Sequence, residues 1–230
     1  MKSARPQPHH ISVQRTARYW TAGPAPAEAI GTLYALHGYG QLGEYFIRKF
    51  QNAADAGWHV VVPEGGHRFY LKGTEGRVGA SWMTKEDRLS DIEDYVAFLD
   101  HLKQRVDSMG AKGPQLLLGF SQGVSTALRW LALGTGGTAA WRAVIAHSGV
   151  IPPDLPKGAE TLQLAPPLHL VNGDEDPYYT DPESGFRTSE REWTASGGDP
   201  GQITRHIFQG GHTIDPAVVQ RILDGFLHAS

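Results

Sequence analysis

Short apolar segments alternate with longer segments of helical period along the chain. Apolar runs of six or seven residues are typical of buried strands, and they lie at 32–37, 58–64, 115–120, 143–149, 167–173 and 203–209. The segments between and after them predict helices at 43–55, 85–107, 122–134, 189–196 and 216–229. This alternation favours an α/β fold in which a mostly parallel, twisted sheet carries helices on both faces.

Two further patterns complete the predicted fold. The longest helix should bury one apolar stripe, formed by Leu89, Ile92, Val96, Leu99, Leu102 and Val106. Residues 10–20 alternate between apolar and polar with a period of two, which predicts an antiparallel hairpin at one edge of the sheet. Because no repeat or low-complexity linker interrupts the sequence, we expect a single domain over 1–230, with 1–12 as a mobile N-terminal segment.

Composition narrows the choice of partner. The formal net charge is -3 and charges of both signs are mixed along the chain, so no basic surface for nucleic acid is expected. No apolar run reaches the ~18 residues of a membrane span, and no signal-peptide pattern is present, so we expect a cytoplasmic protein. The absence of cysteine excludes disulfides, thiolate metal sites and a cysteine nucleophile. A small-molecule ligand is the expected partner, and the sequence leaves open whether the protein is a monomer or a homodimer.

The sequence GFSQG at 119–123 lies between an expected strand and an expected helix. Its glycines flank Ser121 where a sharp strand-to-helix turn brings backbone segments together and leaves no space for a Cβ. Such a turn places the serine above the sheet, at the positive end of a helix. The motif alone also fits an ordinary turn, so its interpretation depends on whether a base and an acid accompany the serine.

Candidates for both follow later strands. Asp176 comes after the strand at 167–173, and His212 comes after the strand at 203–209. The order serine, acid, histidine, each on the loop after a successive strand, is that of α/β-hydrolase enzymes. Because ligands of open α/β sheets gather outside the carboxyl ends of the strands, these loops should meet.

Competing residues exist for each role. Asp174 directly follows a glycine and is expected to hold the turn through its side chain, while Glu175 and Asp181 are weaker candidates for the acid. The other histidines fall in expected helices, within strands, in the N-terminal segment or before the acid in sequence. Ser148 is the next candidate for the nucleophile after Ser121.

Two other classes of function remain open. Residues 38–43 read G-x-G-x-x-G between a strand and a helix, and Glu64 ends the next strand where a ribose-binding acid belongs in a dinucleotide-binding fold. His37 lies between the apolar run and the first glycine, and Pro63 directly precedes Glu64. Both features argue against a dinucleotide-binding fold. The second alternative is a hydrolase fold that binds ligands without catalysis.

Together the motifs LHGYG, LGFSQG, NGDEDP and GGH resemble those of the phospholipase/carboxylesterase family of α/β-hydrolases, which includes acyl-protein thioesterases. The resemblance runs from about residue 32 to the C-terminus. It implies Ser121 as nucleophile, Asp176 as acid and His212 as base, with no metal or organic cofactor. It further implies an oxyanion hole formed by the N–H groups of Tyr39 and Gln122. By the same resemblance, Trp82 would lie near the acyl pocket.

Two connections indicate the size of the substrate. The segment 150–166 has three prolines among its first seven residues, so it cannot form a helical cap domain. The longer loop at 65–85 carries Phe69, Tyr70 and Trp82, and exposed aromatic residues there would suit an apolar acyl or aryl group. The alternative for Trp82 is packing against the helix that follows. We expect a carboxylesterase acting on dissolved short- to medium-chain esters, with a thioesterase or lysophospholipase of the same fold as the alternative.

Overall fold

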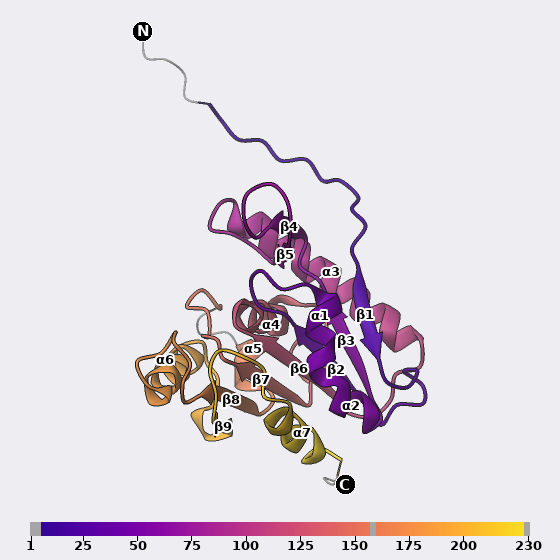
Figure 1. Cartoon of the computed structure of the whole chain (residues 1–230), viewed down its shortest axis with the longest axis vertical. Coiled ribbons are helices and arrows are strands. Elements are labelled where there is room, and N and C mark those ends of the chain that lie inside the picture. Colours follow the sequence, from indigo (N-terminus) through magenta and orange to yellow (C-terminus); the bar gives the residue numbers. More distant parts are fainter. Residues whose placement is uncertain (1–5, 157–159, 228–230) are drawn as a thin grey trace.

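The computed structural model describes residues 6–156 and 160–227. Within these ranges a seven-stranded sheet has the order β1-β3-β2-β6-β7-β8-β9, with β1 antiparallel to β3 and all other neighbours parallel (Figure 1). Its strands are β1 (Tyr19–Ala22), β2 (Gly31–Leu36), β3 (Trp58–Pro63), β6 (Gln115–Phe120), β7 (Ala143–His147), β8 (Leu168–Gly173) and β9 (Ile203–Phe208). The predicted mostly parallel sheet is confirmed, and each predicted buried strand begins and ends within two residues of the observed one.

The helices of the described residues connect these strands. They are α1 (Gly43–Phe46), α2 (Gln51–Asp55), α3 (Arg88–Ser108), α4 (Gln122–Leu133), α5 (Glu160–Gln163), α6 (Pro182–Ala195) and α7 (Pro216–Asp224), with 3-10 turns η1 (Ile47–Phe50), η2 (Thr138–Ala140) and η3 (Pro200–Gln202). The helix expected at 43–55 is divided into three short pieces. Helix α6 begins seven residues earlier than expected, because Asp181 caps its N-terminus by accepting the Ser184 N–H at 2.7 Å.

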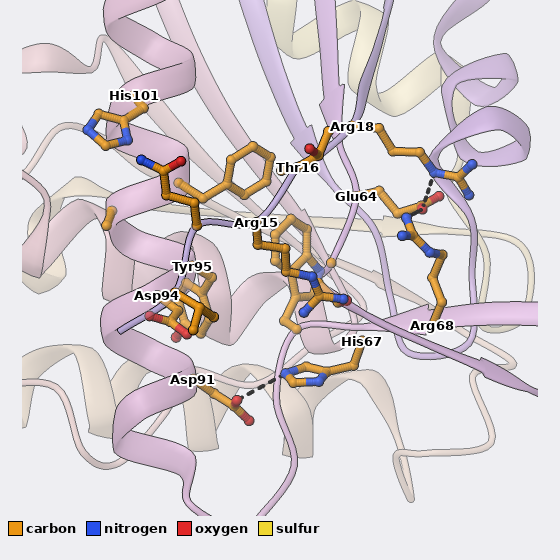
Figure 2. A pocket seen from close by; sticks show the side chains of 18 residues that line it. Arg15, Thr16, Arg18, Glu64, His67, Arg68, Asp91, Asp94, Tyr95 and His101 are labelled. Atoms are coloured by element: carbon orange, nitrogen blue, oxygen red, sulfur yellow. Dashed lines mark hydrogen bonds and ion pairs between the residues drawn. The ribbon is translucent and has the colours of Figure 1, made fainter. Parts of the chain in front are cut away.

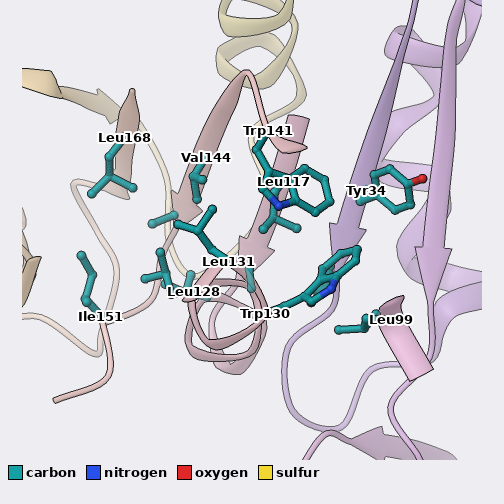
Figure 3. Close-up of a cluster of buried hydrophobic side chains, with 14 of the residues drawn as sticks. Tyr34, Leu99, Leu117, Leu128, Trp130, Leu131, Trp141, Val144, Ile151 and Leu168 are labelled. Carbon is teal, nitrogen blue, oxygen red and sulfur yellow. The ribbon is translucent and has the colours of Figure 1, made fainter. Parts of the chain in front are cut away.

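Successive residues of the central strands face opposite sides of the sheet and enter two cores. Leu117 packs in the core beneath α3, α4 and α6, whereas its neighbour Leu116 packs in the core beneath α1, α2 and α7. Figure 3 shows part of the first core, where Trp130 makes edge contacts with Tyr34 and Trp141 at centroid distances of 5.7 and 4.7 Å. With both faces covered by helices, the loops at the carboxyl edge of the sheet are left to form a site.

Three expectations require correction. Leu89 is 65% exposed, because it lies in the first turn of α3 and the buried stripe begins one turn later at Ile92. Among residues 6–22, β1 is the one strand that forms, so the expected hairpin at 10–20 is wrong; β1 pairs with the free edge of β3. The expected loop at 65–85 contains a hairpin, in which β4 (His67–Tyr70) pairs with β5 (Val78–Ser81).

Candidate active site

Ser121 occupies the tight turn between β6 and α4. Its φ of +54° lies in the left-handed region, which residues other than glycine adopt rarely. The flanking glycines are required by close backbone contacts. A Cβ on Gly119 would lie 2.3 Å from the carbonyl oxygen of Gly123, and one on Gly123 would lie 2.1 Å from that of Leu36. The turn therefore has the geometry that the GFSQG motif predicts, with the serine at the start of α4.

The predicted acid and base are joined by a hydrogen bond. His212 Nδ1 lies 2.8 Å from Oδ2 of Asp176, a carboxylate only 4% exposed, whose Oδ1 accepts the Tyr178 N–H at 3.0 Å. This contact leaves Nε2 as the imidazole nitrogen free to face a nucleophile. Phe120 packs against the His212 ring at a centroid distance of 4.9 Å, which brings the histidine loop beside the turn that carries Ser121.

No hydrogen bond joins the Ser121 hydroxyl to His212 in the described part of the chain. Hydrogen bonds between catalytic groups are commonly long without substrate and tighten in the Michaelis complex. The arrangement therefore holds the predicted base against the predicted acid, next to a serine whose backbone is held in a strained turn.

The acid loop is attached to the histidine loop by a second aspartate. Asp174 Oδ1 accepts the N–H of Gly210 at 2.8 Å, two residues before His212. The position of Asp174 after Gly173 predicted that its side chain holds a turn. It does so, but the turn lies in the loop after β9 and not in its own loop. Asp181, the weaker candidate for the acid, is used as the cap of α6.

Tyr178 is a site residue that the sequence did not identify. Its ring lies over His212 at a centroid distance of 4.5 Å, and the side chain is 76% exposed. Because a tyrosine in a loop after an acidic turn carries no pattern of its own, only the tertiary structure reveals this contact.

The backbone around Tyr39 and Gln122 suits an oxyanion hole. A Cβ on Gly38 would lie 3.0 Å from Cβ of Ser121, so the loop after β2 touches the nucleophile turn. Neither the Tyr39 nor the Gln122 N–H donates to another of the described residues. The Gln122 side chain is fully engaged, since its Nε2 donates to Met83 O at 2.9 Å and its Oε1 accepts the Trp82 N–H at 3.2 Å.

The β4–β5 hairpin is attached to the same loop. The Gly40 N–H donates to Ala80 O at 2.8 Å, and the ring of Tyr39 packs against Phe69 at a centroid distance of 5.1 Å. Tyr39 and Tyr70 are 61% and 48% exposed. Two of the three aromatic residues predicted to contact substrate, Phe69 and Tyr70, therefore lie on an accessible hairpin beside the loop that follows β2.

Trp82 differs from the expectation of an exposed pocket residue. It is 1% exposed, its indole N–H donates to the carbonyl oxygen of His37 at 2.9 Å, and its ring packs against Tyr95 of α3 at 6.2 Å. The indole buries its large apolar surface and satisfies its one polar group, which explains why it turns inward. The alternative that Trp82 packs against the following helix is the one the structure supports.

Trp82 also lines a cavity of about 740 Å³ between residues 13–18, the start of β4 and α3 (Figure 2). None of the proposed triad residues lines it. Its charged groups are largely paired with one another: Glu64 binds Arg18 at 2.6 Å and Arg68 at 3.3 Å.

The ion pairs of Glu64 with Arg18 and Arg68 also make the dinucleotide-binding interpretation wrong. Glu64 is 2% exposed and also accepts the Gly43 N–H at 3.0 Å, so neither group is free for a ribose or a pyrophosphate. Helix α1, which follows the glycine loop, has only four residues. Within 6–156 and 160–227, no three His, Asp or Glu side chains gather in a group that could hold a metal ion.

Comparisons with known proteins identify the family of the chain. The sequence profile of the phospholipase/carboxylesterase family matches residues 25–229. The chain belongs to this family. It is a serine hydrolase of the carboxylic-ester type with an α/β-hydrolase fold. Among residues 6–156 and 160–227, the structure contains no helix that could span a membrane.

Solved structures related to this family member include esterase PE8, at 26% identity and a TM-score of 0.66, covering 92% of this chain and 100% of that one. Acyl-protein thioesterase 2 of Zea mays matches at 20% identity and a TM-score of 0.67, covering 92% and 100%. A carboxylesterase of Bacillus cereus matches at 16% identity and a TM-score of 0.62, covering 91% and 93%. No curated protein sequence matches the chain.

Two buried histidines outside the predicted triad hold the loops of this esterase-family site. His37 Nε2 accepts the Gly65 N–H at 2.9 Å, so its Nδ1–H donates to the carbonyl oxygen of Gly38 at 2.8 Å. Burial lowers the pKa of His37 to about 4. The neutral ring therefore joins the ends of β2 and β3 beneath the loop that carries Tyr39.

His147 has the equivalent role on the other side of Ser121. Its Nε2 accepts the N–H of Asp215 at 3.1 Å, at the cap of α7, and burial lowers its pKa to about 3. Its carbonyl oxygen accepts the Ser121 N–H at 3.0 Å. His147 thus connects the serine turn to the segment after His212, a role that its position before the acid in sequence did not indicate.

Acid should therefore destabilise the fold through these two histidines. Because their pKa values in the folded protein lie below the ~6.5 of an unfolded chain, the unfolded state binds more protons at acid pH. The free energy of unfolding should fall as pH drops from about 6.5 toward 4, by about 1.4 kcal/mol per pH unit for each histidine. Urea unfolding at a series of pH values measures this slope.

A matched pair of variants isolates the effect. His147→Gln removes the titration but keeps an acceptor for the Asp215 N–H, so its unfolding free energy should depend less steeply on pH than that of the parent. His101→Gln changes an exposed histidine of α3 and should keep the parent slope. Equal slopes in the parent and in His147→Gln would contradict the assignment.

Proposed function

We propose that the protein is a carboxylesterase that hydrolyses short- to medium-chain esters through an acyl-enzyme intermediate on Ser121. The observation that carries the proposal is the 2.8 Å hydrogen bond between His212 Nδ1 and Asp176, beside the strained turn of Ser121. It gives the imidazole one defined tautomer, with Nε2 available to accept a proton.

In the first half-reaction, His212 Nε2 takes the hydroxyl proton as Ser121 Oγ attacks the ester carbonyl. The negative charge that develops on the carbonyl oxygen is stabilised by the N–H groups of Tyr39 and Gln122. Asp176 stabilises the imidazolium that forms, and His212 then gives its proton to the departing alcohol. The product of this step is an ester between the acyl group and Ser121.

In the second half-reaction, water takes the place of the alcohol. His212 removes a proton from the water, the resulting hydroxide attacks the acyl-enzyme, and the proton returns to Ser121 as the carboxylic acid leaves. The steps use only side chains and backbone groups of this chain, so the proposal includes no metal or organic cofactor.

The preference for smaller, dissolved esters rests on the connections around the site. Among its described residues, the β7–β8 connection carries only the four-residue helix α5. The aromatic side chains of Phe69 and Tyr70 stand on a two-stranded hairpin rather than on a separate domain. An acyl group would therefore contact an open aromatic surface and not an enclosed channel.

Replacement of the nucleophile tests the proposal directly. Ser121→Ala should lower kcat by about 10³-fold or more while leaving the urea unfolding curve close to that of the parent. Ser148→Ala is the matched control, since Ser148 also follows a strand with a positive φ of +48° and is the alternative nucleophile. If Ser148→Ala abolished hydrolysis and covalent labelling by a fluorophosphonate while Ser121→Ala did not, the nucleophile would be misassigned.

Replacing Asp176 and replacing Asp174 should have different effects on kcat. Asp176→Asn removes the charge that orients and stabilises the His212 imidazolium, so kcat should fall by about 10²-fold or more. Asp174→Asn keeps an oxygen that can accept the Gly210 N–H, so it should act on stability and change kcat by less than about threefold. The reverse order of kcat values would assign the acid to Asp174.

Chain length should control the rate in a characteristic way. For p-nitrophenyl esters of increasing acyl length, kcat/KM should be highest for dissolved short and medium chains and fall for long ones, without a jump above the solubility limit. Rates measured below and above that limit test this expectation. A preference for emulsified long-chain triglyceride would contradict it.

A further inference from the structure

A second groove lies beside the loop that follows β2. Its volume is about 730 Å³, and it runs between α1 and η1 on one side and the start of β5 on the other. It is lined by Gly40, Gln41, Leu42, Tyr45, Phe46, Lys49, Gly76, Arg77 and Val78. Its size is within the range of cavities that hold small molecules.

The groove is lined by two cationic side chains and by no carboxylate. Lys49 comes from η1 and Arg77 from the hairpin, both side chains are exposed, and no carboxylate is among the lining residues. Within the described chain neither cation forms an ion pair or a side-chain hydrogen bond. The cavity of Figure 2 is different, because there Glu64 forms ion pairs with both Arg18 and Arg68.

The groove shares one wall with the loop after β2, which also approaches Ser121. Its wall includes Gly40, which is two residues from Gly38 and hence at most about 7.6 Å from it between Cα atoms. A Cβ on Gly38 would lie 3.0 Å from Cβ of Ser121. Phe46, also in the wall, packs against Phe120 at a centroid distance of 6.1 Å. A substrate held at Ser121 could therefore extend along the loop into this groove.

We propose that this groove is a subsite for an anionic group, a carboxylate or a phosphate, at the far end of the ester substrate. Leu42 and Phe46 would contact the apolar chain that leads away from the ester, and Lys49 and Arg77 would bind the anion from opposite walls. The substrate class that follows is an ester with one ionised end. This inference rests on the proposed esterase function, since it concerns how the same substrate is held.

The expected effect is moderate because both cations are exposed to solvent. Two such charges should favour an anionic over a neutral ester of equal length by about tenfold in kcat/KM at low ionic strength. The preference should weaken at about 0.5 M NaCl, where charges at the surface are screened.

Kinetics on matched substrates tests the subsite. One arm compares the p-nitrophenyl half-ester of adipic acid with p-nitrophenyl hexanoate, which places the anion on the acyl side. The other compares 1-hexanoylglycerol 3-phosphate with 1-hexanoylglycerol, which places it on the alcohol side. We expect an anionic preference in one arm, and that arm identifies which end of the substrate enters the groove.

Charge-removing variants connect the preference to the groove. Lys49→Gln and Arg77→Gln should each lower the ratio of anionic to neutral kcat/KM by about threefold, and the double variant should abolish the preference. Lys72→Gln is the matched control, because Lys72 is an exposed cation in the same hairpin connection but does not line the groove. The parent ratio should persist in this control.

A binding measurement separates this inference from the proposed function. The binding of ligands to the Ser121→Ala variant can be measured by calorimetry. Monoethyl adipate should bind more tightly than ethyl hexanoate, or 1-hexanoylglycerol 3-phosphate more tightly than 1-hexanoylglycerol. Adding Lys49→Gln and Arg77→Gln to this variant should remove the difference. If the parent hydrolyses neutral esters but neither assay shows a preference for anionic ones, the proposed subsite is wrong and the proposed esterase function stands. Absence of hydrolysis of every ester would overturn the proposed function, and the calorimetric comparison would then decide the subsite by itself.

Discussion

The site depends on direct contact between backbone segments at the end of β2 and at the turn after β6. A Cβ on Gly123 would lie only 2.1 Å from the carbonyl oxygen of Leu36, so the turn reaches β2 only because no side chain intervenes. The contact places the loop after β2 beside Ser121, where the proposed oxyanion hole would lie. A larger residue would separate the serine from those donors. Ser121 adopts its strained φ of +54° within this packing.

Around that contact, side-chain acceptors connect the carboxyl ends of successive strands. His37 accepts a backbone N–H beyond β3, Asp174 accepts one beyond β9, and His147 accepts one at the start of α7. Each acceptor is supplied from one loop and each donor belongs to another. The loops that follow parallel strands leave the sheet at the same edge, and these hydrogen bonds fix the positions of the loops relative to one another. The resulting preorganisation is what electrostatic stabilisation of a transition state requires.

The cavity beside α3 and the groove beside α1 have similar volumes but different chemistry. In the cavity beside α3, Glu64 lies between two arginines and forms an ion pair with each. In the groove beside α1, Lys49 and Arg77 have no acidic neighbour among the lining residues. The LHGYG motif contributes Gly40 to one wall of the groove, whereas the hairpin supplies the opposite wall. Under the proposed function, the hairpin would contribute to discrimination between substrates and the loops around Ser121 to the chemical step.

The sequence by itself determined the strands, the serine turn and the family, because each depends on local patterns: apolar runs, glycines flanking a serine, and motifs in a fixed order. It also placed Asp174 in a turn-holding role. Contacts between distant residues were decided only by the tertiary structure. Trp82 turned inward because a buried carbonyl of His37 was available to its N–H, and Tyr178 came to lie over a histidine far along the chain. Such contacts depend on how loops from separate strands meet, and no periodicity within one segment encodes them.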